Sequence, residues 1–129
     1  MSKILIIEED TPLCWLLGKI LGTRYEVTIF ENGMEAWSWL SEKNIPDLII
    51  ADINLPSLDG IELLENIRMS GLLSDIPVIM LSGFPDKAKR MQCLELGAFS
   101  YVEKPFEPQS LLSEIHRGLV YKNEDVFIN

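Results

Sequence analysis

Four apolar stretches of this sequence each end at residues whose side chains can bind ions or carry out acid–base chemistry. The stretches cover residues 4–7, 48–51, 78–81 and 101–103. The residues that follow them are, in order, Glu8-Glu9-Asp10, Asp52, Ser82 and Lys104. If the stretches are parallel strands, their carboxyl ends lie along one edge of a sheet, where open α/β folds bind ligands. Carboxylates, a hydroxyl and an ammonium group then converge, which favours a site for a metal ion and a phosphate.

The elements that position these residues follow a β/α repeat. Strand-like runs begin near Ile4, Tyr25, Leu48, Val78 and Tyr101, which leaves room for a helix and two short loops between successive strands. The run at 48–50 is continuously apolar, as expected for a parallel strand buried on both faces. The run at 25–30 instead alternates apolar with polar residues and predicts an edge strand that is half open to solvent.

Helix signals occupy the connecting segments. The pair Thr11-Pro12 predicts an N-cap followed by proline at the first helical position, in a helix that reaches Gly22. Further helices are predicted over 34–40, from Gly60 to about Gly71, from Asp86 to a left-handed Gly97, and over 108–119. Residues 123–129 are predicted to be a C-terminal tail or a truncated linker.

Five such units predict an α/β fold, namely a flavodoxin-like, doubly wound, five-stranded parallel sheet of order 2-1-3-4-5 with five helices in a single domain, residues 1–122. In that order the first and third strands are neighbours, so Glu8 and Glu9 would face Asp52. Ser82 would lie one strand further out and Lys104 on the last strand, from which its long side chain could reach back.

Composition narrows the class of protein. The chain has 129 residues, 47% of them hydrophobic, and a formal net charge of −9. Such a charge opposes non-specific attraction to nucleic acid, so no direct nucleic-acid partner is expected. No apolar run is long enough to span a bilayer, and Cys14 and Cys93 lack the C-x-x-C spacing of redox or zinc pairs. These features predict a cytoplasmic protein with reduced thiols and no membrane partner.

The motifs, taken in order, resemble the phosphoacceptor receiver domain of bacterial two-component response regulators over residues 3 to about 121. The resemblance rests on the acidic cluster at 8–10, Asp52 with Asn54, the Leu-Pro-Ser-Leu-Asp-Gly loop at 55–60, Ser82-Gly83, and Lys104-Pro105-Phe106. Each motif alone is weakly specific. Their order and their positions at the ends of the predicted elements make the combination specific.

The resemblance implies a role for each site residue. Asp52 would accept a phosphoryl group from a sensor histidine kinase or phosphotransfer protein, because an aspartyl nucleophile gives a labile acyl phosphate. Mg²⁺, or another divalent cation, would be held by Asp52, by Glu8 and Glu9 on the first strand and by the backbone carbonyl of Asn54. Lys104 would pair with the phosphate, and the Ser82 hydroxyl and Gly83 N–H would donate hydrogen bonds to it.

The same resemblance implies a conformational switch. Tyr101 matches an aromatic residue that turns inward on activation, and Pro105 makes the Lys104–Pro105 bond a candidate cis peptide that aims Lys104. Phosphorylation would then change the face made by the fourth helix, fifth strand and fifth helix, which would contact a downstream effector or a second copy in a dimer. Such a domain is not an enzyme beyond catalysing its own phosphotransfer and dephosphorylation.

Two alternatives stay open. The family usually has aspartate where Glu9 stands, and the extra methylene of glutamate fits the octahedral shell of Mg²⁺ poorly. A degenerate receiver, which binds partners without being phosphorylated, is therefore one alternative. An aspartyl-nucleophile phosphatase resembling the haloacid dehalogenases is the other, although its second aspartate is Asn54 here and no substrate-capping insertion is present.

Overall fold

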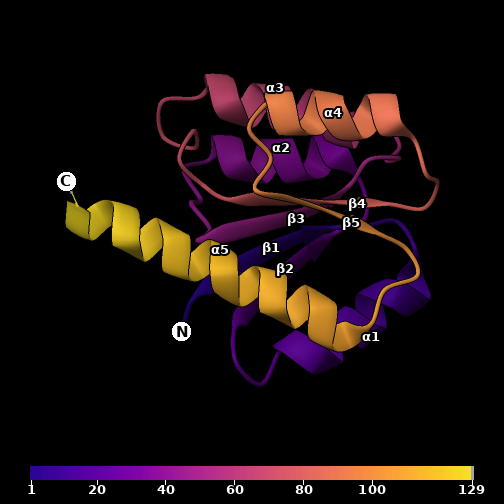
Figure 1. The fold of residues 1–129 in the computed structure, drawn as a ribbon, viewed down its shortest axis with the longest axis horizontal. Helices are drawn as coiled ribbons and strands as arrows, with labels where there is room; N and C mark the ends of the chain where they lie inside the picture. The colour runs from indigo at the N-terminus through magenta and orange to yellow at the C-terminus, as the bar shows by residue number, and fades with distance from the viewer. Residues whose placement is uncertain (129) are drawn as a thin grey trace.

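The chain alternates strands and helices from end to end. The structure is a computed structural model that describes the backbone of residues 1–128 and the side chains of residues 1–122. Its elements, in chain order, are β1 (Lys3–Ile7), α1 (Thr11–Leu21), β2 (Glu26–Phe30), α2 (Gly33–Ser41), β3 (Leu48–Asp52), α3 (Gly60–Met69), β4 (Val78–Ser82), α4 (Lys87–Glu95), β5 (Ser100–Glu103) and α5 (Pro108–Ile128) (Figure 1).

The five strands form one parallel sheet in the order β2-β1-β3-β4-β5, as predicted. The central strands β3 and β4 are buried along their whole length, and β1 is buried from Ile4 onward. The edge strand β2 is half-buried, which confirms the interpretation of its alternating sequence. Parallel pairing places the ends of β1, β3, β4 and β5 along the same edge of the sheet.

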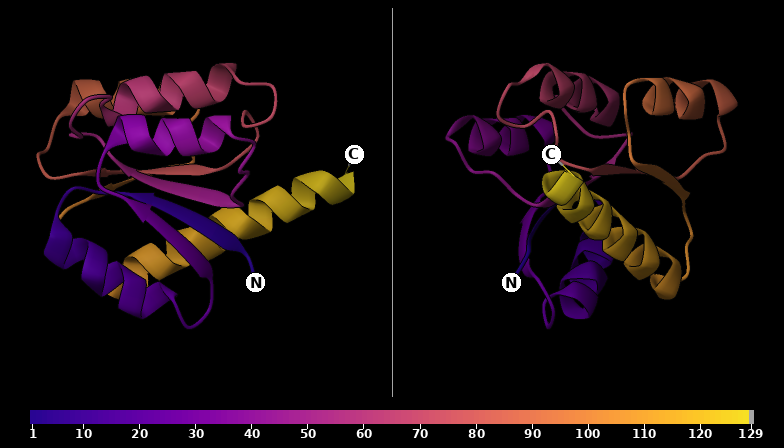
Figure 2. Two further views of the ribbon diagram at one scale, coloured as in Figure 1. Left: turned by 180° about the vertical axis from the view of Figure 1, so that it is seen from behind. Right: turned by 60° about the vertical axis from the view of Figure 1, so that its left-hand side comes forward.

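Helices cover both faces of the sheet. Figure 2 shows α2, α3 and α4 on one face and α1 with α5 on the other. Alternate residues of each strand therefore enter two separate cores. Leu5 and Ile49 pack in the core beneath α2, α3 and α4, whereas Ile4 and Ile50 pack in the core beneath α1 and α5. No helix in the described part of the chain combines the length and the apolar character needed to cross a bilayer.

Acidic and amide side chains begin the helices on the site edge. Asp59 caps α3 and Asp86 caps α4 by accepting backbone N–H groups, as does Asn32 for α2. The predicted cap of α1 is wrong. The N-cap is Asp10, whose carboxylate accepts from Leu13 N at 3.1 Å, and Thr11 is the first helical residue. Both residue types cap helices well, so the sequence alone did not separate the two adjacent candidates.

Two close backbone contacts fix α2 and α3 against the loop after β3. A Cβ atom on Gly60 would lie 2.1 Å from the carbonyl oxygen of Asp52, and one on Gly33 would lie 1.9 Å from that of Leu58. Neither distance is compatible with a side chain. The amino end of α3 therefore sits directly on the backbone of Asp52.

Helix α5 extends further than the sequence indicated. It runs to Ile128, so residues 123–128, for which a tail or truncated linker was predicted, continue the helix. Figure 1 shows this end of α5 projecting beyond the sheet at the edge opposite the carboxyl ends of the strands. Just after the carboxyl end of α4, Gly97 has a φ of 88°, which confirms the predicted left-handed termination of that helix.

Candidate functional site

The side chain of Lys104 joins the carboxylates of two other strands at the carboxyl edge of the sheet. Its ammonium group donates a hydrogen bond to Oδ2 of Asp52 and forms an ion pair with Oε1 of Glu8 at 2.5 Å. Glu8 directly follows β1 and Asp52 ends β3, while Lys104 directly follows β5. Residues 96 positions apart in sequence thus meet at one point, as the strand order predicted.

Glu8 is the most deeply buried charged residue of this site, with no exposed surface. Its Oε2 accepts the backbone N–H of Asp10 at 3.1 Å, and its Oε1 is paired with the Lys104 ammonium group. Burial raises the pKa of Glu8, and the charge of Asp52 adds to this effect, while Lys104 and the Asp10 N–H oppose it. For Lys104, burial acts to lower the pKa, but the two carboxylates outweigh burial and raise it.

Asp52 is held by bonds to both of its carboxylate oxygens. Oδ1 accepts the backbone N–H of Asn54 at 2.8 Å, and Oδ2 accepts from Lys104. The residue is 5% exposed, so only a small part of its surface faces solvent. A carboxylate held in one orientation and reached from one direction is suited to nucleophilic attack on an incoming group.

Ser82 is buried at the end of β4, on the strand next to Asp52. Its hydroxyl donates to the carbonyl of Phe84 at 2.7 Å. The following residues, from Gly83 to Asp86, are exposed and connect β4 to α4. In this structure the hydroxyl therefore stabilises the β4–α4 loop, and it is available to another acceptor only if its bond to Phe84 breaks.

Tyr101 lies on β5 with its ring half-buried against α4. The guanidinium carbon of Arg90 is 5.8 Å from the ring centroid, within cation–π range. The tyrosine hydroxyl is buried and has no hydrogen-bond partner among the described residues. A buried hydroxyl without a partner costs free energy, so the Tyr101 hydroxyl is destabilised in this position.

The predicted cis peptide bond between Lys104 and Pro105 is present.

The predicted metal ligands are not all gathered. Glu8 and Asp52 converge, but Glu9 is exposed. Asn54, whose backbone carbonyl was predicted as a ligand, lies beside Asp52 and bonds its Oδ1 through the backbone N–H. Within the part of the chain that the structure describes, no group of three or more His, Cys, Asp or Glu side chains is arranged to hold a metal ion. The buried carboxylates of Glu8 and Asp52 nevertheless supply hard oxygen donors, which fit a divalent cation that keeps several water ligands.

Sequence reasoning missed two contacts of the site. The buried thiol of Cys14 donates to the backbone carbonyl of Glu8 at 3.0 Å, and burial raises the pKa of this thiol to about 11. The Phe84 carbonyl was not expected to hold Ser82. Loop geometry determines both contacts, and neither has a signature in the sequence.

A family model, a curated relative and a solved structure similar to this chain all come from response regulators or transcriptional regulators. A family model described as "Response regulator receiver domain" matches residues 4–116. The probable transcriptional regulator ycf27 of Guillardia theta is 38% identical over 131 residues, which covers 98% of this chain and 48% of that protein. A CheY-like response regulator receiver domain protein from Methanospirillum hungatei superposes with a TM-score of 0.89 at 30% identity, covering 97% of this chain and 98% of that one.

Two further comparisons bear on extent and on metal binding. The chain spans about half the length of the curated relatives it matches, including ycf29 of Porphyra purpurea and ycf27 of Cyanophora paradoxa. The response regulator Rcp1, whose structure was determined in a Mn²⁺-bound form, superposes with a TM-score of 0.78 at 28% identity, covering 88% of each chain.

Proposed function

The chain belongs to the response regulator receiver domain family, and on this premise we propose that it is a phosphorylation switch in which Asp52 is the phosphoacceptor. The observation that carries the proposal is the contact of Lys104 with both Glu8 and Asp52. An ammonium group held between two buried carboxylates offsets their repulsion at rest and is in place to pair with a phosphate on Asp52.

The transfer step follows from the geometry of Asp52. A carboxylate oxygen attacks the phosphorus of a phosphohistidine on a sensor kinase or phosphotransfer protein. The new O–P bond forms as the P–N bond breaks, and the electron pair of that bond returns to the imidazole nitrogen. The product is an acyl phosphate, which water can hydrolyse. The catalytic activity proposed for the chain is limited to this transfer and to the loss of its own phosphate.

A divalent cation belongs to the proposal. Glu8 and Asp52 would hold it, with the Asn54 carbonyl and with Glu9 if its side chain turns inward; Mg²⁺ would supply positive charge to the phosphoryl oxygens. The Mn²⁺-bound form of the similar response regulator Rcp1 supports a divalent cation in this proposal.

The response of the loop after β4 is the next proposed step. A phosphate on Asp52 adds negative charge and acceptor oxygens one strand away from Ser82. The Ser82 hydroxyl would leave Phe84 and donate to a phosphate oxygen, together with the Gly83 N–H. Release of the loop would let the Tyr101 ring change its position, so that its buried, unpartnered hydroxyl finds an acceptor and the face formed by α4, β5 and α5 changes.

This face carries opposite charges on its two sides. The first turn of α4 carries the exposed basic residues Lys87, Lys89 and Arg90, and Glu95 near the end of α4 is an exposed acid. The acidic residues Glu103, Glu107 and Glu114 lie at the end of β5, just before α5 and in the second turn of α5. A two-fold axis through the face would set each side against its opposite in a second copy. We therefore propose this face as the contact with a second copy or a downstream effector.

The two unbridged thiols are consistent with a cytoplasmic location.

A degenerate receiver remains the second candidate, because Glu9 is exposed at the position of the usual metal ligand. Mass spectrometry after incubation with acetyl phosphate and Mg²⁺ separates the two. We expect one labile phosphoryl group on the wild type and none on Asp52→Asn. Unchanged labelling of Asp52→Asn would reject Asp52 as the acceptor, and an unlabelled wild type would favour the degenerate receiver.

A further inference from the structure

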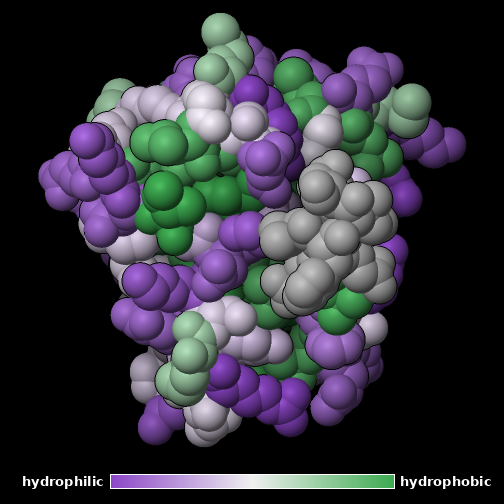
Figure 3. Space-filling model, turned by 90° about the vertical axis from the view of Figure 1, so that its left-hand side faces the viewer, coloured by the Kyte–Doolittle hydropathy of each residue, from purple (hydrophilic) through white to green (hydrophobic). Residues whose placement is uncertain are grey.

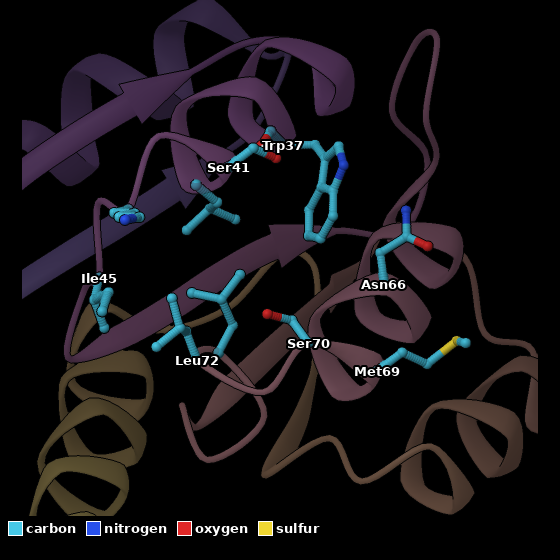
Figure 4. Close-up of a pocket in the computed structure, with 10 residues that line it drawn as sticks. Trp37, Ser41, Ile45, Asn66, Met69, Ser70 and Leu72 are labelled. Atoms are coloured by element: carbon cyan, nitrogen blue, oxygen red, sulfur yellow. Dashed lines mark hydrogen bonds between the residues drawn. The ribbon is translucent and has the colours of Figure 1, made fainter.

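A recess opens at the edge of the sheet opposite Asp52. It has a volume of about 430 Å³ and lies between the carboxyl ends of α2 and α3 and the loops that follow them. Figure 4 shows Trp37 from α2, Asn66 and Met69 from α3, and Ile45 and Leu72 from the two loops around this space. This volume is in the range of small-molecule sites, about 300 to 1,000 Å³. None of the phosphorylation-site residues lines the recess.

Apolar side chains around the recess are unusually exposed. Ile45 is 45% exposed, Leu72 62% and Met69 85%. Figure 3 views this end of the molecule and shows a large apolar patch bordered by polar residues, with smaller apolar areas elsewhere on the same face. Single exposed apolar residues are common, but three around one cavity mark a surface that is stabilised when something covers it.

The charged residue at the recess is basic, whereas the chain as a whole has a net negative charge. The protein has 20 acidic and 11 basic residues, yet among the residues whose side chains the structure describes, Lys43 is the only charged one that lines the cavity. Lys43 is exposed and forms no ion pair within the part of the chain that the structure describes. Its backbone, with a φ of 67°, is tied to the end of α2 by a bond from its N–H to the Leu40 carbonyl. The cation is therefore attached to a fixed point of the rim.

From this combination we propose that the recess binds a small amphipathic anion, whose aromatic or aliphatic body fills the cavity and whose carboxylate or sulfonate pairs with Lys43. This site shares no residue with the proposed phosphorylation site. A peptide helix is a poorer fit, because it needs a long groove with several anchor positions. An anionic membrane surface is also a poorer fit, because the net charge of −9 opposes it.

Two related dyes test the proposal. The anionic probe is 8-anilinonaphthalene-1-sulfonate, and its uncharged counterpart is N-phenyl-1-naphthylamine, which has a similar aromatic body. In fluorescence titrations of the full chain, Lys43→Gln is expected to weaken the anionic dye about twofold to fivefold and to leave the neutral dye unchanged. Leu72→Glu, which places a carboxylate at an exposed position of the opening, is expected to weaken the anionic dye more strongly.

The matched control is Lys19→Gln. Lys19 also lies beside an exposed aromatic residue, 5.5 Å from the ring of Trp15, but on α1 and away from the recess. This variant should bind both dyes as the wild type does, and all variants should keep cooperative urea unfolding. In NMR spectra the indole N–H of Trp37, assigned with Trp37→Phe, should shift on adding the dye, while that of Trp15 stays in place.

Three outcomes would overturn the proposal. One is the absence of saturable binding of the anionic dye at submillimolar concentration. Another is an affinity that Lys43→Gln and Leu72→Glu leave unchanged, and the third is an indole shift at Trp15 without one at Trp37. None of these outcomes depends on phosphorylation of Asp52. Ligand binding at the recess can therefore be refuted while Asp52 is still the phosphoacceptor, and Asp52 can be refuted as the phosphoacceptor while the recess still binds its ligand.

Discussion

Replacing Lys104 by methionine should destabilise the fold in a pH-dependent way. Methionine keeps most of the apolar stem but removes the ammonium group, which leaves the carboxylates of Glu8 and Asp52 buried without their counter-ion. Breaking a buried pair by removing one partner typically costs about 3 to 5 kcal/mol. The Lys104 side chain is 21% exposed, so some solvent screening remains. We therefore expect a loss of about 2 to 3 kcal/mol at about pH 8.

The pH dependence follows from Glu8. Its pKa in the folded protein is already raised above the ordinary value of 4.5, so its contribution to stability is fully present below pH 4.5 and is lost as the pH rises through the folded pKa. Without Lys104 that pKa rises further. Lys104→Met should therefore recover stability relative to the wild type as the pH falls from about 8 to about 5, because Glu8 takes up a proton.

Urea unfolding at the two pH values measures these differences. Glu8→Gln in the Lys104→Met background should restore part of the stability at the higher pH, since it removes one of the two uncompensated charges. The exposed Lys19→Met is the control and should change the free energy of unfolding little. A loss from Lys104→Met that is equal at both pH values, or below about 0.5 kcal/mol at the higher one, would refute this account of the site.

Three other predictions follow from the structure. Glu9→Asp should bind Mg²⁺ more tightly than the wild type in calorimetry, because the shorter side chain suits the octahedral shell; equal or weaker binding would count against a metal role for position 9. Lys104→Ala should still bind beryllofluoride but lose the chemical-shift change at Tyr101, and a full wild-type change would exclude Lys104 as the coupling residue. Arg68→Met should cost about 2 to 4 kcal/mol in urea unfolding, because the Arg68 guanidinium bonds the carbonyls of Ser74, Ile76 and Gly97, and a loss below about 1 kcal/mol would contradict this.

The strand order could be predicted because buried parallel strands leave long apolar runs, and right-handed crossovers limit how such runs connect. That order was enough to bring Lys104 to Asp52. The orientation of Glu8 and Glu9 could not be predicted in the same way. Both follow β1, and the backbone bond from Glu8 N to the Phe30 carbonyl, at 3.0 Å, helps to place Glu8 inside while Glu9 remains outside.

The state of the loop after β4 was also beyond sequence reasoning. A serine at a strand end can bond a phosphate or a nearby carbonyl with equal ease, and the Ser82–Phe84 contact depends on the path of four exposed residues. The recess at Lys43 had no signal either. Trp37 reads as ordinary helix packing in the sequence, and only the folded chain places Met69 and Leu72 beside it.

Because Gly60 at the amino end of α3 lies against the Asp52 carbonyl, a small tilt of α3 at this contact would displace its carboxyl end by a larger distance. The helix has 10 residues and is therefore about 15 Å long, with its amino end at Asp52 and its carboxyl end at Met69. A tilt of about 4° at the amino end displaces the far end by about 1 Å, which is enough to change the shape of a cavity that Met69 lines. The same geometry works in reverse, so an occupant that wedges the far end of α3 applies a torque at the backbone of Asp52. By thermodynamic linkage, any such influence on binding affinity must be equal in both directions.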